Sequence, residues 1–192
     1  MSTINEKLLW QLFIEGEINA FSSLFKTYYS ELHNYGIKIT SDQMITEDCL
    51  QSFFVYLYNS RENLGTINNV KSYLFISFRR ALLKFIKKER RYTSYDQIFE
   101  TNEIFGFSTV ELAIDQEVVK LKNETLASLL NALSVRQREV IYLKYYSNLT
   151  TNEISEVMDI SYQSVLNLLQ KAFTKLRSKV EDQKISAIFK IN

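Results

Sequence analysis

Apolar residues recur at intervals of three and four along most of the chain, which is the spacing of one face of an α-helix. In the N-terminal half this pattern predicts helices near 8–13, over 18–39, from 46 onward and over about 69–90. Ser41 or Thr46 is the expected cap of the third of these helices. In the C-terminal half the pattern predicts helices over 121–133 and 135–146, with a short one near 110–119.

Residues 150–177 contain two apolar stripes separated by the break Asp159-Ile160-Ser161. The first stripe is formed by Ile154, Val157 and Met158, and the second by Val165, Leu168, Leu169, Ala172, Phe173, Leu176 and Val180. Ser161 suits the N-cap of the second helix, and Asp159 is among the few non-glycine residues that tolerate a left-handed backbone. This spacing predicts a helix–turn–helix.

Burial of the second stripe would leave the opposite side of that helix exposed. It carries amides and an amine, which suit base edges and phosphates, on the face formed by Tyr162, Gln163, Leu166, Asn167, Gln170 and Lys171. Leu166 could contact thymine methyl groups or extend the buried stripe. An ordinary amphipathic helix pair is the alternative interpretation of the whole segment.

The composition predicts an all-α protein, because the chain has no proline and only four glycines, the residues that strands and tight turns recruit. It has no apolar run of 18 residues and no signal-like N-terminus, so we expect a cytoplasmic location without membrane insertion. His33 and Cys49 are the only residues of their types, and no phosphate-binding loop or zinc motif is present. We therefore expect no catalytic residue, metal or cofactor, and interpret Trp10 as a packing anchor.

Charge is distributed in blocks. The net charge is −4 over residues 1–69, +7 over 70–92, −6 over 93–119 and +4 over 120–192. In the second block eight basic residues alternate with the aromatic residues Tyr73, Phe75, Phe78, Phe85 and Tyr92. Basic side chains can bind phosphates, and aromatic rings can stack on unpaired nucleobases. Alternatively the apolar side chains belong to the core, as we favour for Phe85 and Ile86, and the basic residues form a solvated face.

Three further runs give these halves a family resemblance. Residues 132–146 (ALSVRQREVIYLKYY) and the helix–turn–helix after them resemble region 4 of a bacterial sigma factor, and 46–58 (TEDCLQSFFVYLY) with 70–81 (VKSYLFISFRRA) resemble region 2. The chain thus resembles an extracytoplasmic-function (ECF) sigma factor of the sigma-70 family, over roughly residues 18–180.

The resemblance implies two small helical domains joined by a flexible linker. Residues 1–92 would be region 2, 93–119 an acidic linker, 120–183 region 4 and 184–192 a tail. The implied function is alternative-sigma transcription initiation: binding core RNA polymerase, at the β′ clamp and β flap, and directing it to promoter DNA. A typical further partner is an anti-sigma factor. The acidic linker would thread through a basic polymerase channel or shield the basic modules from each other.

The resemblance also assigns candidate sites. Those for the −35 element are Ser161, Tyr162, Gln163, Ser164, Leu166, Asn167, Gln170 and Lys171. Those for the −10 element are Tyr73, Arg79, Arg80, Lys84, Lys87, Lys88, Arg90 and Arg91. Those for core polymerase are Glu47, Asp48, Gln51, Phe54 and Tyr58. Glu47 and Asp48 could equally be acids that favour the positive end of a helix.

Several residues depart from the family pattern. In the C-terminal half, Ser134 stands where the family usually has proline, Ser155 where it has alanine and Asp159 where it has glycine. Leu166 stands where a basic residue is common. In the N-terminal half, Arg80 stands in place of an asparagine and Ser52 in place of an acidic residue. Base recognition is therefore not transferred to Arg80, nor polymerase binding to Ser52. Two other functions remain open: a helix–turn–helix regulator that binds duplex DNA without being a polymerase subunit, and an adaptor that binds protein.

Overall fold

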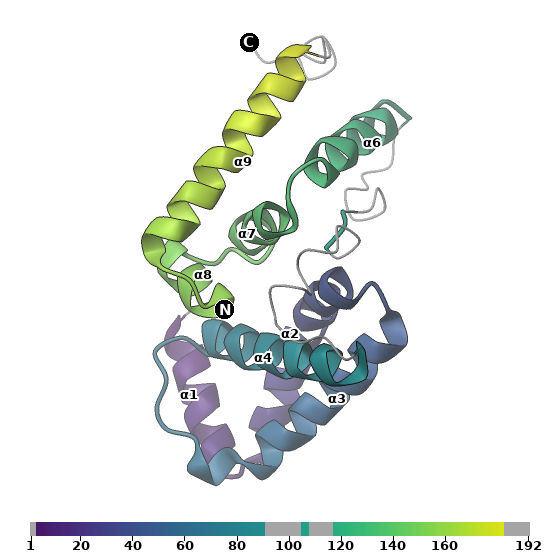
Figure 1. The fold of residues 1–192 in the computed structure, drawn as a ribbon. Helices are drawn as coiled ribbons and strands as arrows, with labels where there is room; N and C mark the ends of the chain where they lie inside the picture. The colour runs from purple at the N-terminus through teal and green to yellow at the C-terminus, as the bar shows by residue number, and fades with distance from the viewer. Residues whose placement is uncertain (1–2, 91–104, 108–116, 183–192) are drawn as a thin grey trace. The chain divides into compact units, whose positions relative to one another are not determined.

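The computed structural model describes residues 3–90, 105–107 and 117–182, and its regular elements over these ranges are all helical (Figure 1). This confirms the predicted all-α class. The helices fall into an N-terminal unit with α1 to α4 and a C-terminal unit with α6, α7, α9 and most of α8. Within the described ranges, no helix is both long and apolar enough to cross a bilayer.

The N-terminal unit is built around α2. Its helices are α1 (Thr3–Ile14), α2 (Ile18–Thr40), α3 (Gln43–Asn59), the short 3-10 helix η1 (Arg61–Asn63) and α4 (Val70–Arg90). Helix α2 packs against α1, α3 and α4, and α3 also packs against α4. The fully buried side chains of this core come from all three long helices and include Leu24, Leu32, Tyr35, Ile39, Leu50, Leu74, Phe75, Phe78 and Leu82.

The start of α3 differs from the prediction. The helix begins at Gln43, because the Asp42 carboxylate caps it by accepting from the Ile45 N–H at 3.0 Å. Ser41 instead ends α2 in a left-handed conformation, with φ of 55°. Thr46 is buried within α3, where its hydroxyl lies 2.7 Å from the Thr40 hydroxyl and donates to the Asp42 carbonyl. The predicted caps at Ser41 and Thr46 were therefore wrong.

Trp10 anchors α1, as predicted. Its ring is 2% exposed and makes edge or tilted contacts with the rings of Phe13 and Tyr73, at centroid distances of 5.3 and 5.2 Å. Its indole N–H donates to the Gly65 carbonyl at 3.2 Å, so the single tryptophan ties α1 to the loop before α4.

The C-terminal unit contains α6 (Glu117–Asn131), α7 (Val135–Tyr145), α8 (Thr151–Met158) and α9 (Tyr162–Asp182). Helix α7 packs against α9. Ser134 forms a capping box with Gln137 at the start of α7, so serine in place of proline gives this helix a defined start. The short helix predicted near 110–119 falls mostly on residues outside the described ranges, and its last three residues belong to α6.

The predicted helix–turn–helix is confirmed. Helices α8 and α9 are separated by residues 159–161, and Asp159 has a φ of 55°, the left-handed conformation expected there. The Ser161 hydroxyl accepts from the Ser164 N–H at 3.1 Å, which caps α9. Ile154, Val157, Met158 and Val165 are buried.

Residues 105–107 of the predicted linker belong to the C-terminal unit. Phe105 and Phe107 are 0% and 5% exposed, and their rings contact Tyr142 of α7. The other linker residues before α6, together with the tail from 183, lie outside the described ranges.

Candidate nucleic-acid and polymerase interfaces

Helix α9 presents a continuous polar face. Its buried side is held by Val165 and Ala172, and the residues predicted for the opposite side are all exposed: Tyr162, Gln163, Leu166, Asn167, Gln170 and Lys171. Gln163 donates from Nε2 to the Asn167 Oδ1 at 3.2 Å, so the two amides orient each other. Ser161 is exposed but its hydroxyl caps the helix, and Ser164 is half-buried.

Two apolar side chains of α9 answer questions that the sequence left open. Leu166 is 36% exposed and lies on the polar face, so it does not extend the buried stripe. Phe173 was predicted to be buried but is 46% exposed, and its ring meets Tyr145 of α7 edge-on at 6.1 Å. Both helices therefore contribute to an exposed aromatic pair.

The polar face of α9 continues one turn further than predicted. A shallow groove of about 510 Å³ is lined by Asn167, Gln170, Lys171, Thr174, Lys175 and Ser178. Lys175 follows Lys171 by four residues, which places both amines on one side of the helix. Sequence analysis missed Lys175, although this spacing from Lys171 could have indicated it.

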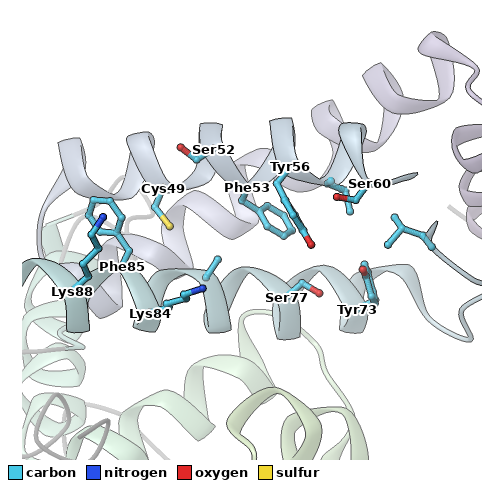
Figure 2. Close-up of a pocket in the computed structure, with 13 residues that line it drawn as sticks. Cys49, Ser52, Phe53, Tyr56, Ser60, Tyr73, Ser77, Lys84, Phe85 and Lys88 are labelled. Atoms are coloured by element: carbon cyan, nitrogen blue, oxygen red, sulfur yellow. The ribbon is translucent and has the colours of Figure 1, made fainter. Parts of the chain in front are cut away.

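A second groove, of about 350 Å³, lies between α3 and α4 (Figure 2). Its apolar floor includes Phe53 and Leu57, and Tyr56, 70% exposed, stands at its edge. Figure 2 shows Lys88 and Phe85 near Cys49 at one end, and Tyr73 near Ser60 at the other. The groove thus combines aromatic rings with two cations. Tyr56 was missed as a lining residue, since nothing in its spacing distinguishes it from the core positions.

The basic residues of α4 differ in their exposure to solvent. Arg80, Lys84 and Lys88 are exposed, whereas Lys87 is half-buried. Arg79 is 7% exposed, because it follows the buried Phe75 by four residues and shares its core-facing side. The assignment of Arg79 to a DNA-contacting surface therefore does not fit the structure. The Arg90 side chain and all of Arg91 lie outside the described residues.

The aromatic residues of α4 also separate. Phe75 and Phe78 are fully buried, as is Ile86 at 2% exposure, so these are core residues. Phe85 is half-buried in the wall of the groove between α3 and α4, and Tyr73 lines the other end. Only part of the basic–aromatic pattern thus reaches the surface.

The outer face of α3 carries the residues predicted for polymerase. Asp48 and Gln51 are exposed. Glu47 accepts from the Gln43 amide at 2.8 Å, and its Oε1 lies 3.4 Å from the His33 Nε2. His33 therefore has Glu47 as a neighbour, and the described residues hold no cluster of three potential metal ligands.

Phe54, also predicted for the polymerase interface, is 3% exposed. It packs against the Phe25 ring of α2 at 4.8 Å. Phe54 instead contributes to an apolar pocket of about 300 Å³, lined also by Phe21, Phe25, Gln51, Val55, Tyr58 and Asn59. Phe25 and Val55 are 36% and 55% exposed and were missed by the sequence analysis. Apolar side chains therefore adjoin Gln51 on the surface.

Cys49 is buried and free. Burial raises the pKa of its thiol to about 11, so the thiol is protonated at neutral pH. A protonated, buried thiol is neither a nucleophile nor a metal ligand.

Comparison with known proteins identifies the family. Residues 24–92 match the model of sigma-70 region 2, and residues 123–176 match that of sigma-70 region 4. The chain belongs to the sigma-70 family. These two regions cover the grooved α3–α4 face and the helix–turn–helix, so both candidate surfaces of this sigma factor lie within them.

Curated relatives and solved structures agree. The sigma factor is 22% identical over 156 residues to the ECF RNA polymerase sigma factor SigM of Bacillus subtilis, covering 81% of this chain and 91% of SigM. It is 22% identical over 178 residues to SigX of the same organism, covering 86% and 89%.

CnrH, solved in complex with the cytosolic domain of CnrY, matches with a TM-score of 0.61 and 18% identity over 92% of this chain and 97% of CnrH. RpoE of Bartonella quintana, solved with the anti-sigma factor NepR, matches with a TM-score of 0.57 and 18% identity, over 90% and 98% of the two chains. The sigma factor is of the ECF type.

Proposed function

We propose that this ECF sigma factor binds core RNA polymerase in the cytoplasm and directs it to promoters by recognising −10 and −35 elements. The observation that supports this most strongly is the presence of both sigma regions in order in one chain, each with an exposed basic surface. Its role is to position a catalytic partner, and we assign it no catalysis of its own. Region 2 would be residues 1–92 and region 4 residues 120–183, joined by the acidic segment 93–119.

Helix α9 would read the −35 element. Its exposed amides Gln163 and Asn167 suit base edges in the major groove, and Lys171 and Lys175 suit the phosphates on one side of it. The exposed Leu166 would contact thymine methyl groups. Tyr162 and the hydroxyls of Ser161 and Ser164 extend this face to the start of α9, where the helix dipole favours phosphate, and Gln170 lies further along it.

Substitutions on α9 should separate positioning from base reading. We expect Lys171→Ala to weaken −35 binding equally for all sequences and to reduce the slope of log affinity against log salt by about 0.9. Gln163→Ala or Asn167→Ala should instead lower discrimination between bases by about 1–3 kcal/mol. Competition binding of the full chain with core polymerase to −35 variants measures both. A change of base preference in Lys171→Ala would contradict the phosphate assignment.

Helix α4 and its groove with α3 would hold the melted −10 strand. Arg80, Lys84 and Lys88 are exposed cations suited to the backbone, and Tyr73 and Tyr56 offer rings on which unpaired bases can stack. Lys87, Arg90 and Arg91 stay candidates for contact with the same DNA strand.

The outer face of α3 would bind polymerase at the β′ clamp. Asp48 and Gln51 are exposed beside the apolar pocket formed by Phe25, Phe54 and Tyr58. Polar groups around an apolar centre are the usual composition of a protein interface. In region 4 we propose the exposed pair Tyr145 and Phe173 as the contact for the β flap.

An anti-sigma protein is a further proposed partner. The two solved structures described above hold partner proteins, the cytosolic domain of CnrY and the anti-sigma factor NepR. Such a partner would compete with polymerase for the apolar pocket at Phe25 and Phe54 and for the exposed pair Tyr145 and Phe173. Exposed apolar patches of this kind are typical binding sites for other proteins.

Run-off transcription with purified core polymerase tests the proposal. We expect the sigma factor to produce discrete transcripts from a subset of a genomic promoter library, and no transcripts when it is omitted. A chain that binds duplex DNA in the absence of core polymerase and yields no promoter-specific transcript would be a regulator instead. No salt-dependent DNA affinity at all would indicate an adaptor.

A further inference from the structure

One stripe of side chains from each helix forms the groove between α3 and α4 (Figure 2). Side chains four residues apart lie on the same face of a helix. The stripes are Tyr73, Ser77, Ala81 and Phe85 on α4, and Cys49, Phe53, Leu57 and Ser60 on α3. Figure 2 shows Cys49 near Phe85 and Ser60 near Tyr73, so the two helices follow the groove in opposite chain directions.

The floor of the groove is apolar. Its three buried lining residues are Cys49, Phe53 and Leu57. Burial raises the pKa of the Cys49 thiol to about 11, so this side chain carries no charge at neutral pH. Such a floor binds a ligand by removing its hydrocarbon from water, and it offers no strong partner to hydrogen-bonding groups of the ligand.

Positive charge lies at one end of the groove only. Lys84 and Lys88 are exposed one turn apart on α4, and Figure 2 shows Lys88 near Cys49. No acidic residue lines the groove within the described part of the chain, and the lining residues at the other end, around Tyr73, are uncharged. Both amines can therefore contact one anionic group, while the rest of the groove suits hydrocarbon.

The dimensions suit a single alkyl chain. From Tyr73 to Lys84 the groove follows eleven residues of α4, a length of about 16 Å at the rise of an α-helix. Its volume of about 350 Å³ is near the lower end of the range for small-molecule sites, roughly 300–1,000 Å³. One extended chain of medium length, such as that of dodecanoate, spans this distance. A diacyl phospholipid carries two longer chains and a glycerol, which the groove does not hold.

Under the proposed function, the melted −10 strand would use the rim of the same groove. Nucleobases carry donors and acceptors on their edges, which the apolar floor would leave unpaired. Stacked on Tyr56 and Tyr73, they would keep these edges in water while the phosphates contact Lys84 and Lys88. An alkyl chain has no such groups and can occupy the floor. An anionic head on this chain would then take the two amines from the DNA.

We propose that the α3–α4 groove binds a free medium-chain fatty acid, with its carboxylate at Lys84 and Lys88 and its alkyl chain on the floor towards Tyr73. Bound there, the fatty acid excludes the −10 strand and prevents promoter opening. The binding site rests on the geometry of the groove, whereas its regulatory effect rests on the proposed function. The sigma factor would thus respond directly to a ligand chemically unlike DNA or polymerase.

Fluorescence of Trp10 in the full chain reports on binding. The Trp10 ring meets the Tyr73 ring edge-on at 5.2 Å. Its indole N–H donates to the carbonyl of Gly65, which follows the lining residue Leu64. We therefore expect dodecanoate to give a saturable change in the emission of this single tryptophan. Phosphatidylglycerol vesicles should give no change, because the groove takes one free chain.

Titration calorimetry tests the head group and the chain separately. Affinity across octanoate, decanoate and dodecanoate should rise by about two- to fourfold per methylene. Lys84→Gln with Lys88→Gln should lower dodecanoate affinity on the order of tenfold, whereas uncharged decanol should bind both forms equally. Lys171→Gln with Lys175→Gln is the matched control. It removes two amines from a groove of α9 whose lining residues are all polar, so dodecanoate affinity should stay unchanged.

Larger side chains in the middle of the groove test the position of the alkyl chain. Ser77 and Ala81 are half-buried and lie one turn apart on α4. Ala81→Phe should fill the floor and abolish saturable dodecanoate binding. Ser77→Leu is a second variant with the same expected result, and the unfolding midpoint of each shows whether its fold is intact.

Order of addition in run-off transcription tests the regulatory effect. Dodecanoate added to the sigma factor and core polymerase before promoter DNA should inhibit, with half inhibition near its dissociation constant. Added after the open complex has formed, it should leave a single round of transcription unchanged, because the DNA strand already occupies the groove. Equal inhibition in both orders would show an effect on core polymerase and overturn the regulatory inference.

The binding site and the proposed function fail in different ways. Absence of saturable dodecanoate binding, or equal affinity in Ala81→Phe and the original chain, overturns the site. A response to vesicles but not to dodecanoate also overturns it and indicates a membrane surface instead. Binding without inhibition overturns the regulation. A chain that directs no promoter-specific transcript refutes the proposed function, while the Trp10 and calorimetric measurements still test the site.

Discussion

Reversing the charge of Lys84 and Lys88 together is expected to abolish promoter opening while duplex −35 binding persists. Both amines are exposed at the same end of the α3–α4 groove and follow each other by four residues. If each makes one charge-assisted contact of roughly 1.5 kcal/mol with a phosphate, losing both reduces affinity by on the order of 100-fold. Repulsion by the two new glutamates adds to this. Permanganate footprinting of the open complex measures the loss directly.

Controls separate this effect from net charge. Lys7→Glu with Lys26→Glu makes the same change of charge at two exposed positions on α1 and α2. It should leave opening within about twofold, since neither residue lines the α3–α4 groove and exposed charges are screened by salt. Lys84→Arg with Lys88→Arg should keep most of the activity. An equal loss in the Lys7 and Lys26 variant would show that the α3–α4 groove has no special role.

The helix–turn–helix was predictable because its determinants are local. The break at residues 159–161, the Ser161 cap and the left-handed Asp159 depend on a few consecutive residues, and each matches the structure. The exposed face of α9 follows directly from the helical period once the stripe through Val165 and Ala172 is buried. Phe173 was misassigned because it lies at the edge of that stripe, where the width of the neighbouring helix decides exposure.

Positions decided by packing between helices were harder to predict. Phe54 was predicted to contact polymerase beside Gln51, and its packing against Phe25 of α2 buries it. Arg79 was read as one more base in a basic run, whereas the side of α4 it occupies faces the core. Helix α3 starts earlier than predicted because Asp42 caps it. The sequence pattern gives the helical period of the apolar residues, but it does not show which neighbouring helix covers each face.

The acidic region illustrates a different failure. Its net negative charge indicated a linker. The net charge of the whole segment gave no sign of Phe105 and Phe107, two large apolar residues on either side of a glycine. Phenylalanine side chains are usually buried, so such a pair within a polar segment should pack against a neighbouring part of the protein. Its partner, Asn131, lies 24 residues away from Phe107, at the end of another helix, so no local pattern connects them.

Replacing Gly36 by alanine is expected to destabilise the N-terminal unit, although helix propensity predicts the opposite. Alanine in the middle of an exposed helix stabilises it by about 1 kcal/mol relative to glycine. In α2, however, a Cβ at Gly36 would lie 2.5 Å from the Thr46 Cγ2 and 3.1 Å from the Phe78 Cζ. Overpacking of a closed core costs about 1–3 kcal/mol, so the net effect should be a loss of stability.

The hydroxyl bonds of Thr46 explain why the clash is not relieved cheaply. Its Oγ1 lies 2.7 Å from both the Thr40 hydroxyl and the Asp42 carbonyl, which holds the Cγ2 methyl group towards α2. Denaturant unfolding followed by fluorescence of Trp10, the only tryptophan, reports on this unit. Gly65→Ala is the control, because a Cβ there meets no atom within 4 Å, and its midpoint should stay nearly unchanged.

A double-mutant cycle then tests the cause. Thr46→Ser removes the methyl group but keeps the hydroxyl, so it alone should cost roughly 1 kcal/mol as a small cavity. Combined with Gly36→Ala it should restore much of the lost stability, because the new Cβ occupies the space of the deleted methyl group. Positive coupling of about 1 kcal/mol or more identifies the contact between Gly36 and Thr46 as the constraint. Simple additivity would instead assign the loss to Phe78, whose Cζ would lie 3.1 Å from the new Cβ.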